Sequence, residues 1–178
     1  MSVDQIKLQQ VINECDKHIL RMNSAYKKAA AILPLNKEKY DALSEDDISH
    51  IDQYLFRFAK LQDTIGRRLF KLILILLEED VEELSFIDLL NRLEKLNILE
   101  STEQWLELRK IRNTLSHTYE DEPEEMSIVI NILFNKKQSI EAIYSRLINY
   151  GVKSRLRQRS DNDELNRKEC HSKKQAEN

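Results

Sequence analysis

The side chains of this sequence that are best suited to chemistry fall within one short stretch, from Arg109 to His117. If that stretch is helical, they follow one another around about 140° of the helix surface, at about 100° per residue. In angular order they are Arg112, Ser116, Arg109, Asn113 and His117. Arginine supplies planar, permanently charged donors that match phosphate oxygens, and histidine exchanges protons near neutral pH. This polar stripe therefore predicts a site for a phosphate ester.

A purely structural role for the same residues is an alternative. Arg112 borders the apolar face of its helix, so it needs a partner, which could be a structural carboxylate on a neighbouring helix. Gln62 and Asp63 interrupt the apolar seam of an earlier helix. Gln62 could set the packing register there, and either side chain could support Arg112 or His117 from a second layer.

The elements that must position the polar stripe are predicted to be long helices. With two Gly and two Pro in 178 residues, the chain can form neither a P-loop nor a Gly-rich dinucleotide site, and a hairpin-rich fold is excluded. Apolar residues spaced by three and four positions are typical of amphipathic helices. They predict helices from Leu8 to Leu33, from Ser44 to about Glu79, from Ser85 to Leu96, from Ser101 to the residue before Pro123, and from Pro123 to Gly151. Residues 35–43 read as a connection, and the fold class is an all-α antiparallel bundle of four to five helices.

Charge divides the chain into a body over residues 1–151 and a polar tail over residues 152–178. The whole chain has a net charge of −3, and the tail holds eight Lys or Arg against five Asp or Glu, so the body is acidic. An acidic body does not favour indiscriminate nucleic-acid binding, so any RNA contact would need a local basic cleft. The tail is expected to be mobile, and its basic cluster could tether RNA or an acidic partner, or simply be solvated. That cluster comprises Lys153, Arg155, Arg157 and Arg159.

Metal, disulfide and membrane chemistry are not expected. Cys15 and Cys170 lie far apart in the sequence, and His18 and His50 have no ligand-type neighbours at metal spacing. The longest apolar run, from Leu72 to Leu77, is far shorter than a membrane span, and the first residues do not resemble a secretory signal. We therefore expect a cytoplasmic protein with reduced thiols, no metal and no cofactor.

The polar stripe carries a resemblance to a known family. The run Arg112-Asn113-x-x-x-His117-x-Tyr119 resembles the RNxxxHxY form of the Arg-x4-6-His signature of HEPN domains. The chain resembles in particular the HepT-like toxins that are encoded beside minimal nucleotidyltransferase (MNT) antitoxins. Residues 56–66 (FRFAKLQDTIG) are similar to the second helix of that group, so the resemblance covers roughly residues 1 to 150.

The resemblance implies a metal-independent endoribonuclease that acts as a homodimer, as the toxin of a toxin–antitoxin pair. On this chain, His117 would take the proton of the ribose 2′-hydroxyl or protonate the leaving oxygen. Arg112 would stabilise the charge that builds on the phosphorus. Asn113 would orient the imidazole or hold a phosphate oxygen, and Arg109 and Ser116 are supporting candidates for substrate binding.

Tyr119 has two interpretations. By helical spacing it falls on the core side, so it could be a packed tyrosine with a satisfied hydroxyl. The resemblance implies instead that the nucleotidyltransferase partner attaches AMP to this tyrosine. The added bulk and negative charge beside Arg112 would block RNA binding.

Two other functional classes remain open at this point. One is a non-catalytic HEPN-type subunit that binds a nucleotide or docks a nucleotidyltransferase through the polar stripe. The other is a helical interaction module without small-molecule chemistry. Saturable nucleotide binding without turnover would distinguish the former from the nuclease.

Overall fold

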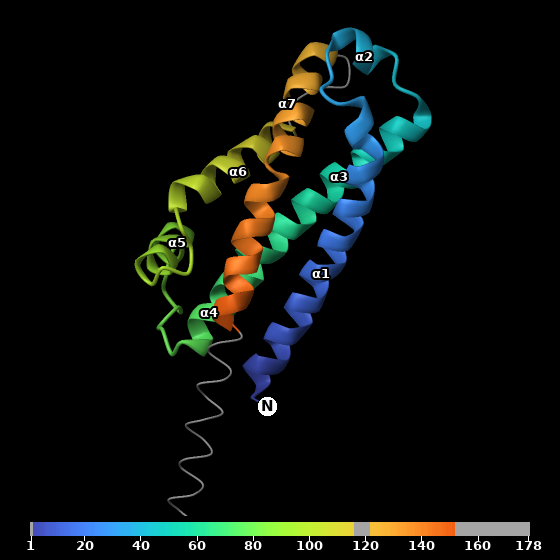
Figure 1. Cartoon of the computed structure of the whole chain (residues 1–178). Coiled ribbons are helices and arrows are strands. Elements are labelled where there is room, and N and C mark those ends of the chain that lie inside the picture. Colours follow the sequence, from blue (N-terminus) through green and yellow to red (C-terminus); the bar gives the residue numbers. More distant parts are fainter. Residues whose placement is uncertain (1, 116–121, 152–178) are drawn as a thin grey trace, which may run out of the picture.

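The computed structural model of this chain describes residues 2–115 and 122–151, and within those residues it contains helices and no strand (Figure 1). The predicted all-α fold class is therefore confirmed. The elements in chain order are α1 (Val3–Ala29), a 3₁₀ turn (Ala30–Ile32), α2 (Lys37–Asp41), α3 (Glu45–Thr64), a π-helix (Ile65–Leu69), α4 (Phe70–Leu76), α5 (Phe86–Lys95), α6 (Thr102–Leu115) and α7 (Pro123–Asn135). Residues 137–151 are also helical.

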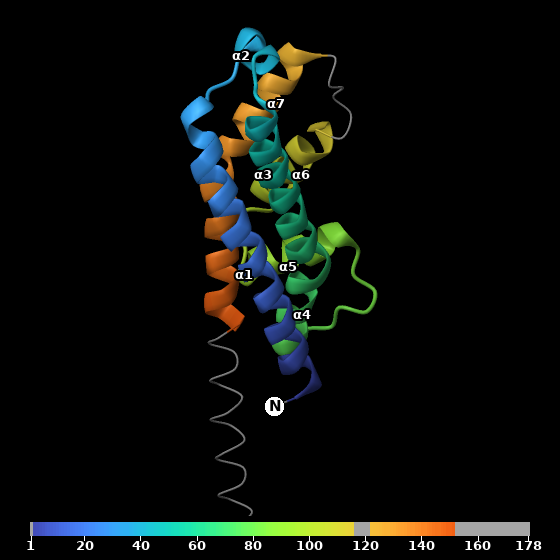
Figure 2. The same ribbon diagram turned by 90° about the vertical axis from the view of Figure 1, so that its right-hand side faces the viewer.

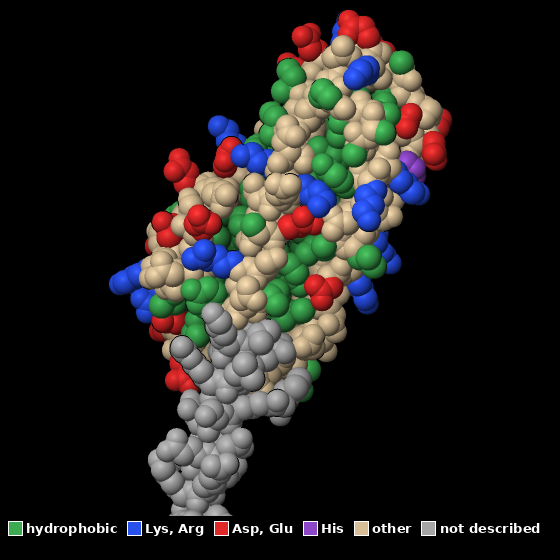
Figure 3. Space-filling view, viewed as in Figure 1, with side chains coloured by type: hydrophobic (Ala, Val, Ile, Leu, Met, Phe, Trp, Pro, Cys, Tyr) green, Lys and Arg blue, Asp and Glu red, His purple; other side chains and the backbone are tan. Residues whose placement is uncertain are grey.

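The long helices run side by side along one axis. α1 runs antiparallel to the rod formed by α3, the π-helix and α4, and α7 with its helical continuation runs beside both, in the same direction as the rod (Figures 1 and 2). α5 and α6 cover one side of this rod, and α6 crosses it obliquely. On the face seen in Figure 3, hydrophobic side chains show mainly in the seams between helices, and acidic and basic side chains are interspersed. Of the polar stripe, Arg112 lies directly against the end of α3.

Most of the predicted helix ends are present. Ser44 and Asp47 form a capping box at the start of α3, and the Ser85 hydroxyl accepts a hydrogen bond from the Asp88 N–H. The Ser101 hydroxyl accepts one from the Gln104 N–H at 3.1 Å. Pro123 occupies the first turn of α7, where its missing N–H costs nothing. Gly151, expected to stop the last helix, is itself helical, and the tail after it lies outside the described residues.

The structure corrects three boundaries. The connection over residues 35–43 contains the short helix α2, which Asn36 caps and which is too short to show a hydrophobic period. The helix from Ser44 to Glu79 is interrupted by the π-helix, which no apolar spacing signals. The last helix is broken by a turn at Lys136. The three- and four-residue apolar spacing that begins after Ser44 also predicts an inward side chain at Ile48, which is instead 38% exposed.

Two Schellman motifs end the helices that precede the site. After α4, Glu78 adopts a left-handed conformation with φ of 60°, and the Glu79 N–H donates to the Leu74 carbonyl at 3.1 Å. After α5, Asn97 has φ of 56°, and the Ile98 N–H donates to the Leu93 carbonyl at 2.9 Å. Both motifs close helix ends that carry no glycine. The two motifs lie on either side of the segment that contains α5, and they fix the direction in which the chain enters and leaves that segment.

A polar contact between α1 and α3 makes stability depend on pH. Burial lowers the pKa of the His18 imidazole below its ordinary value, the positive charge of Arg57 lowers it further, and Glu14 opposes both. His18 Nδ1 lies 3.5 Å from Arg57 Nη1, whereas Glu14 Oε1 is 3.9 Å from Nε2. The unfolded chain therefore takes up a proton at His18 more readily than the folded chain does.

We expect His18→Gln to flatten the loss of stability in mild acid. Because the folded pKa is lowered, the stability that His18 contributes is complete above its unfolded pKa of about 6.5 and falls as the pH drops below it. Urea midpoints of the wild type and of His18→Gln, compared between about pH 7.5 and about pH 5.5, measure the difference. Equal declines in the two proteins would contradict the assignment.

Candidate functional site

Arg112 is held between α6 and the end of α3. Its Nε donates a hydrogen bond to Gln62 Oε1 at 3.1 Å, and its Nη2 pairs with Asp63 Oδ1 at 2.9 Å. The Arg112 side chain is still 23% exposed, so the guanidinium is not sealed inside the protomer. The neighbouring carboxylate anticipated for this arginine is therefore Asp63. Gln62 also supports Arg112, which is one of the two roles that the sequence allowed for Gln62.

Gln62 is the buried member of this arrangement. It is 2% exposed, and its amide Nε2 has no hydrogen-bond partner among the described residues. Because Oε1 accepts from Arg112, the orientation of the amide is determined and the remaining group is a donor. A buried amide donor without an acceptor is uncommon in folded proteins, so this one needs an explanation.

The π-helix brings Trp105 close to the rod just beyond Asp63. A Cβ atom at Gly66 would lie 3.1 Å from Cζ2 of the Trp105 ring, so the absence of a side chain lets the indole approach the backbone. Trp105 is 1% exposed and packs edge-on against Phe70, with ring centroids 4.7 Å apart. Its indole Nε1 also has no partner among the described residues. Single π-turns within α-helices frequently mark functional sites.

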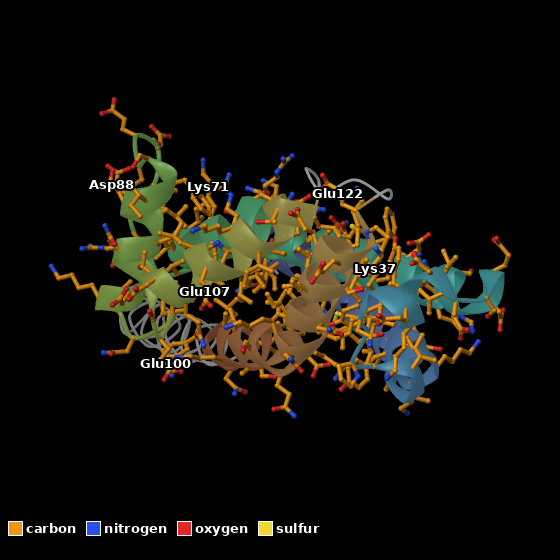
Figure 4. All side chains as sticks on the ribbon, turned by 90° about the horizontal axis from the view of Figure 1, so that it is seen from above. Lys37, Lys71, Asp88, Glu100, Glu107 and Glu122 are labelled. Carbon is orange, nitrogen blue, oxygen red and sulfur yellow. The ribbon has the colours of Figure 1, made fainter. Side chains whose placement is uncertain are left out.

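A pocket of about 400 Å³ opens between the end of α3, the π-helix, α5 and α6. Its apolar lining consists of Gly66, Leu84, Phe86, Leu89 and Trp105. Its charged lining consists of Arg67, Lys71, Arg109, Arg112 and one carboxylate, Asp63. Figure 4 shows Lys71 at the outer edge of the molecule on one side of α6, and Glu107, which pairs with Lys136 at 3.0 Å, on the other side.

The pocket is locally basic although the body of the chain is acidic. Four of its lining side chains are cationic and one is anionic. Within residues 2–115 and 122–151, neither Arg67 nor Lys71 pairs with a carboxylate. A concave site with cations at its mouth and a low-dielectric lining concentrates anions more strongly than a flat surface does. The arrangement can therefore hold an anionic ligand that also has a flat apolar part.

The polar stripe is only partly assembled in this pocket. Arg109 is exposed, its guanidinium lies 4.8 Å from the centroid of the Phe86 ring, and it shares the pocket with Arg112. Asn113 does not line the pocket; it lies with Arg109 along a more open depression on the surface of α6. Ser116, His117 and Tyr119 lie outside the described residues. The structure thus places Arg109 and Arg112 at the same pocket and leaves Asn113 outside it.

Four contributors to the site were not singled out from the sequence. They are Gly66, Arg67, Lys71 and Trp105. A lone glycine inside a long helical pattern is a signal of close approach by another group. Two cations four residues apart on the same helix are a second signal, because they share one face.

Comparisons of this chain with protein-family models, curated proteins and solved structures found no match. None of the helices in the described ranges combines the length and apolarity that crossing a bilayer requires. Function has therefore to be inferred from the residues of the site, with Arg112 and the pocket beside it as the geometric core.

Proposed function

We propose that this chain is a HEPN-type, metal-independent endoribonuclease of the HepT-like toxin class. The observation that supports this most strongly is the placement of Arg112, whose guanidinium is anchored through two of its nitrogens at the mouth of a basic pocket. A preorganised donor of this kind is what phosphoryl chemistry requires, because it stabilises developing charge without reorganising. The next candidate in the signature, His117, follows five residues later in the sequence.

The proposed reaction is cleavage of the RNA strand by its own 2′-hydroxyl. His117 takes the 2′-hydroxyl proton, the 2′-oxygen forms a bond to phosphorus, and the bond from phosphorus to the 5′-oxygen breaks. A second imidazole returns a proton to that leaving oxygen. Arg112 stabilises the phosphorane, Arg109 and Ser116 bind flanking phosphates, and Asn113 orients the imidazole. No metal ion or cofactor takes part in these steps.

The proposal includes a homodimer and a partner protein. Two copies related by a two-fold axis would supply two arginines and two histidines to one cleft, and so both the base and the acid. The partner is an MNT-type nucleotidyltransferase antitoxin, acting in the cytoplasm by binding or by attaching AMP to Tyr119. Charge and bulk at that position would oppose RNA binding at Arg112.

One observation favours a second candidate function. Asp63 already neutralises Arg112 at 2.9 Å, so a phosphate must share the guanidinium with a carboxylate. That arrangement also suits a non-catalytic HEPN-type subunit that binds a nucleotide or docks a nucleotidyltransferase. Such a subunit needs recognition but no transition-state stabilisation.

Comparison of the wild type with His117→Ala separates these functions. We expect purified wild type to cleave single-stranded RNA in the presence of EDTA and to inhibit growth when expressed in bacteria. His117→Ala should lose both effects, because proton transfer contributes about 10²- to 10⁴-fold to such reactions. His50→Ala, a histidine change near the start of α3, is the matched control and should behave as the wild type does.

Two results would count against the nuclease. If the wild type and His117→Ala leave RNA equally intact, the proposed nuclease function is wrong. Saturable nucleotide binding by both proteins without turnover would then support the second candidate.

A further inference from the structure

We propose that the pocket between α3, α5 and α6 is a base-recognition subsite that holds one unstacked nucleobase of the bound strand. This inference rests on the proposed function, because the strand is the proposed RNA substrate. It adds a feature that cleavage alone does not require, namely selection of the nucleotide beside the cut. The pocket is called the base pocket below.

The size and lining of the base pocket suit a flat aromatic ligand. Its volume of about 400 Å³ lies within the range of small-molecule sites, and a single nucleobase fills only part of it. The partly exposed Phe86 supplies the aromatic surface, Leu84 and Leu89 complete the apolar lining, and Trp105, which is 1% exposed, lies beneath it as the floor of the pocket. Stacking on aromatic side chains is the usual way in which proteins hold bases drawn out of a strand.

Two buried donors supply the polar part of the recognition. Gln62 and Trp105 both line the base pocket, both are more than nine-tenths buried, and each has a side-chain N–H without an acceptor among the described residues. The hydrogen bond from Arg112 holds the amide oxygen of Gln62, so the amide nitrogen is the donor left over. Both donors are covered in this structure, so a base reaches them when the adjoining lining moves aside. The carbonyl oxygens and ring nitrogens of a base are acceptors of the required kind.

The charged lining accounts for the rest of the nucleotide. Arg67, Lys71 and Arg109 are exposed at the same pocket, where the phosphates on either side of an inserted base would pass. Arg112 belongs both to this lining and to the proposed cleavage site. A base held in the pocket is therefore that of a nucleotide next to the phosphate that Arg112 contacts, and the pocket selects where the strand is cut.

The single tryptophan of the chain reports on occupancy directly. Trp105 is the only tryptophan in the sequence and forms the floor of the base pocket, so a base held in the pocket should quench its fluorescence. The probes are short single-stranded 2′-fluoro RNAs, which lack the attacking hydroxyl. An abasic strand of equal length and charge, and a free nucleoside monophosphate, are titrated in parallel with the full-length protein.

We expect quenching by the base-bearing strand and not by the abasic strand, even though both carry the phosphates that bind the cations. Equal quenching by both strands, or by neither, would overturn the base pocket. Quenching by the free nucleotide at concentrations as low as those of the strand would assign the pocket to a free ligand, and so would also overturn it. If the protein does not cleave RNA but the base-bearing strand still quenches its fluorescence more than the abasic strand does, the base pocket is supported and only the nuclease proposal is wrong.

Gln62→Glu tests the donor itself. The glutamate keeps an oxygen for Arg112 Nε and removes the Nε2 donor, so a merely structural role for Gln62 would be preserved. We expect the affinity for the base-bearing strand to fall about tenfold, while that for the abasic strand changes less. Gln53→Glu, the same change at an exposed site on α3, is the matched control and should affect both strands equally. Unchanged discrimination between the two strands in folded Gln62→Glu would overturn the assignment of this donor.

Discussion

Replacing Arg112 by lysine is expected to lower the rate of RNA cleavage by roughly 100-fold or more while the protein remains folded. Lysine keeps the positive charge but concentrates it at one nitrogen. It cannot contact Gln62 Oε1 and Asp63 Oδ1 together and still present a second edge to a phosphate. The loss therefore reports on the shape of the guanidinium as well as on its charge.

Initial rates on a labelled RNA, at equal concentrations of wild type and Arg112→Lys, measure this effect. Arg21→Lys, a change of the same type at an exposed position on α1, is the control and should leave the rate unchanged. Thermal unfolding of both variants shows whether the fold is retained. Near-normal cleavage by folded Arg112→Lys would mean that Arg112 serves only to join α6 to α3.

The largest expected effect on stability comes from Phe58 on α3. Its side chain is fully buried, and its ring centroid lies 6.1 Å from that of Tyr54, whose hydroxyl donates to the Leu133 carbonyl at 2.9 Å. Phe58→Ala should lower the free energy of unfolding by about 3–5 kcal/mol, because it removes apolar contacts and leaves a cavity between helices.

Phe56 provides a matched control on the same helix. It is 51% exposed, and the cations of Arg57 and Lys60 lie 5.0 and 5.6 Å from its ring centroid. Phe56→Ala should cost about 1 kcal/mol or less, since little area is lost and exposed cation–π contacts are weak. Urea denaturation of both variants gives the two values, and equal losses would contradict the packing described for α3.

Those features of the fold that depend on local patterning could be predicted from the sequence. The three- and four-residue spacing of apolar side chains indicated α1, α3, α5, α6 and α7, and Ser44, Ser85 and Pro123 marked helix starts through chemistry confined to one turn. α2 was missed because five residues cannot display a period. The π-helix was missed because its residues continue an apolar seam that reads as ordinary helix.

The candidate site could be predicted only in part, for a different reason. A carboxylate partner for Arg112 was anticipated, but the choice of Asp63 depends on the register between α3 and α6, which is a tertiary property. Trp105 lies in the core, and nothing local in the sequence shows that the same ring also borders a pocket. The roles of His117 and Tyr119 stay predictions, because both residues lie outside the described part of the chain.

The π-helix over Ile65–Leu69 has a consequence for how such a protein can diverge. A π-turn accommodates one residue more than the α-turn it replaces, so loss of a single codon there would restore an unbroken α-helical rod. Because the wider turn absorbs the extra residue, the helix downstream would keep about its present orientation relative to α3. Gln62 and Asp63 would keep their hold on Arg112, whereas the backbone at Gly66, against which Trp105 packs, would change its course. Gain or loss of one codon in this turn would thus reshape the floor of the base pocket and leave Arg112 in place.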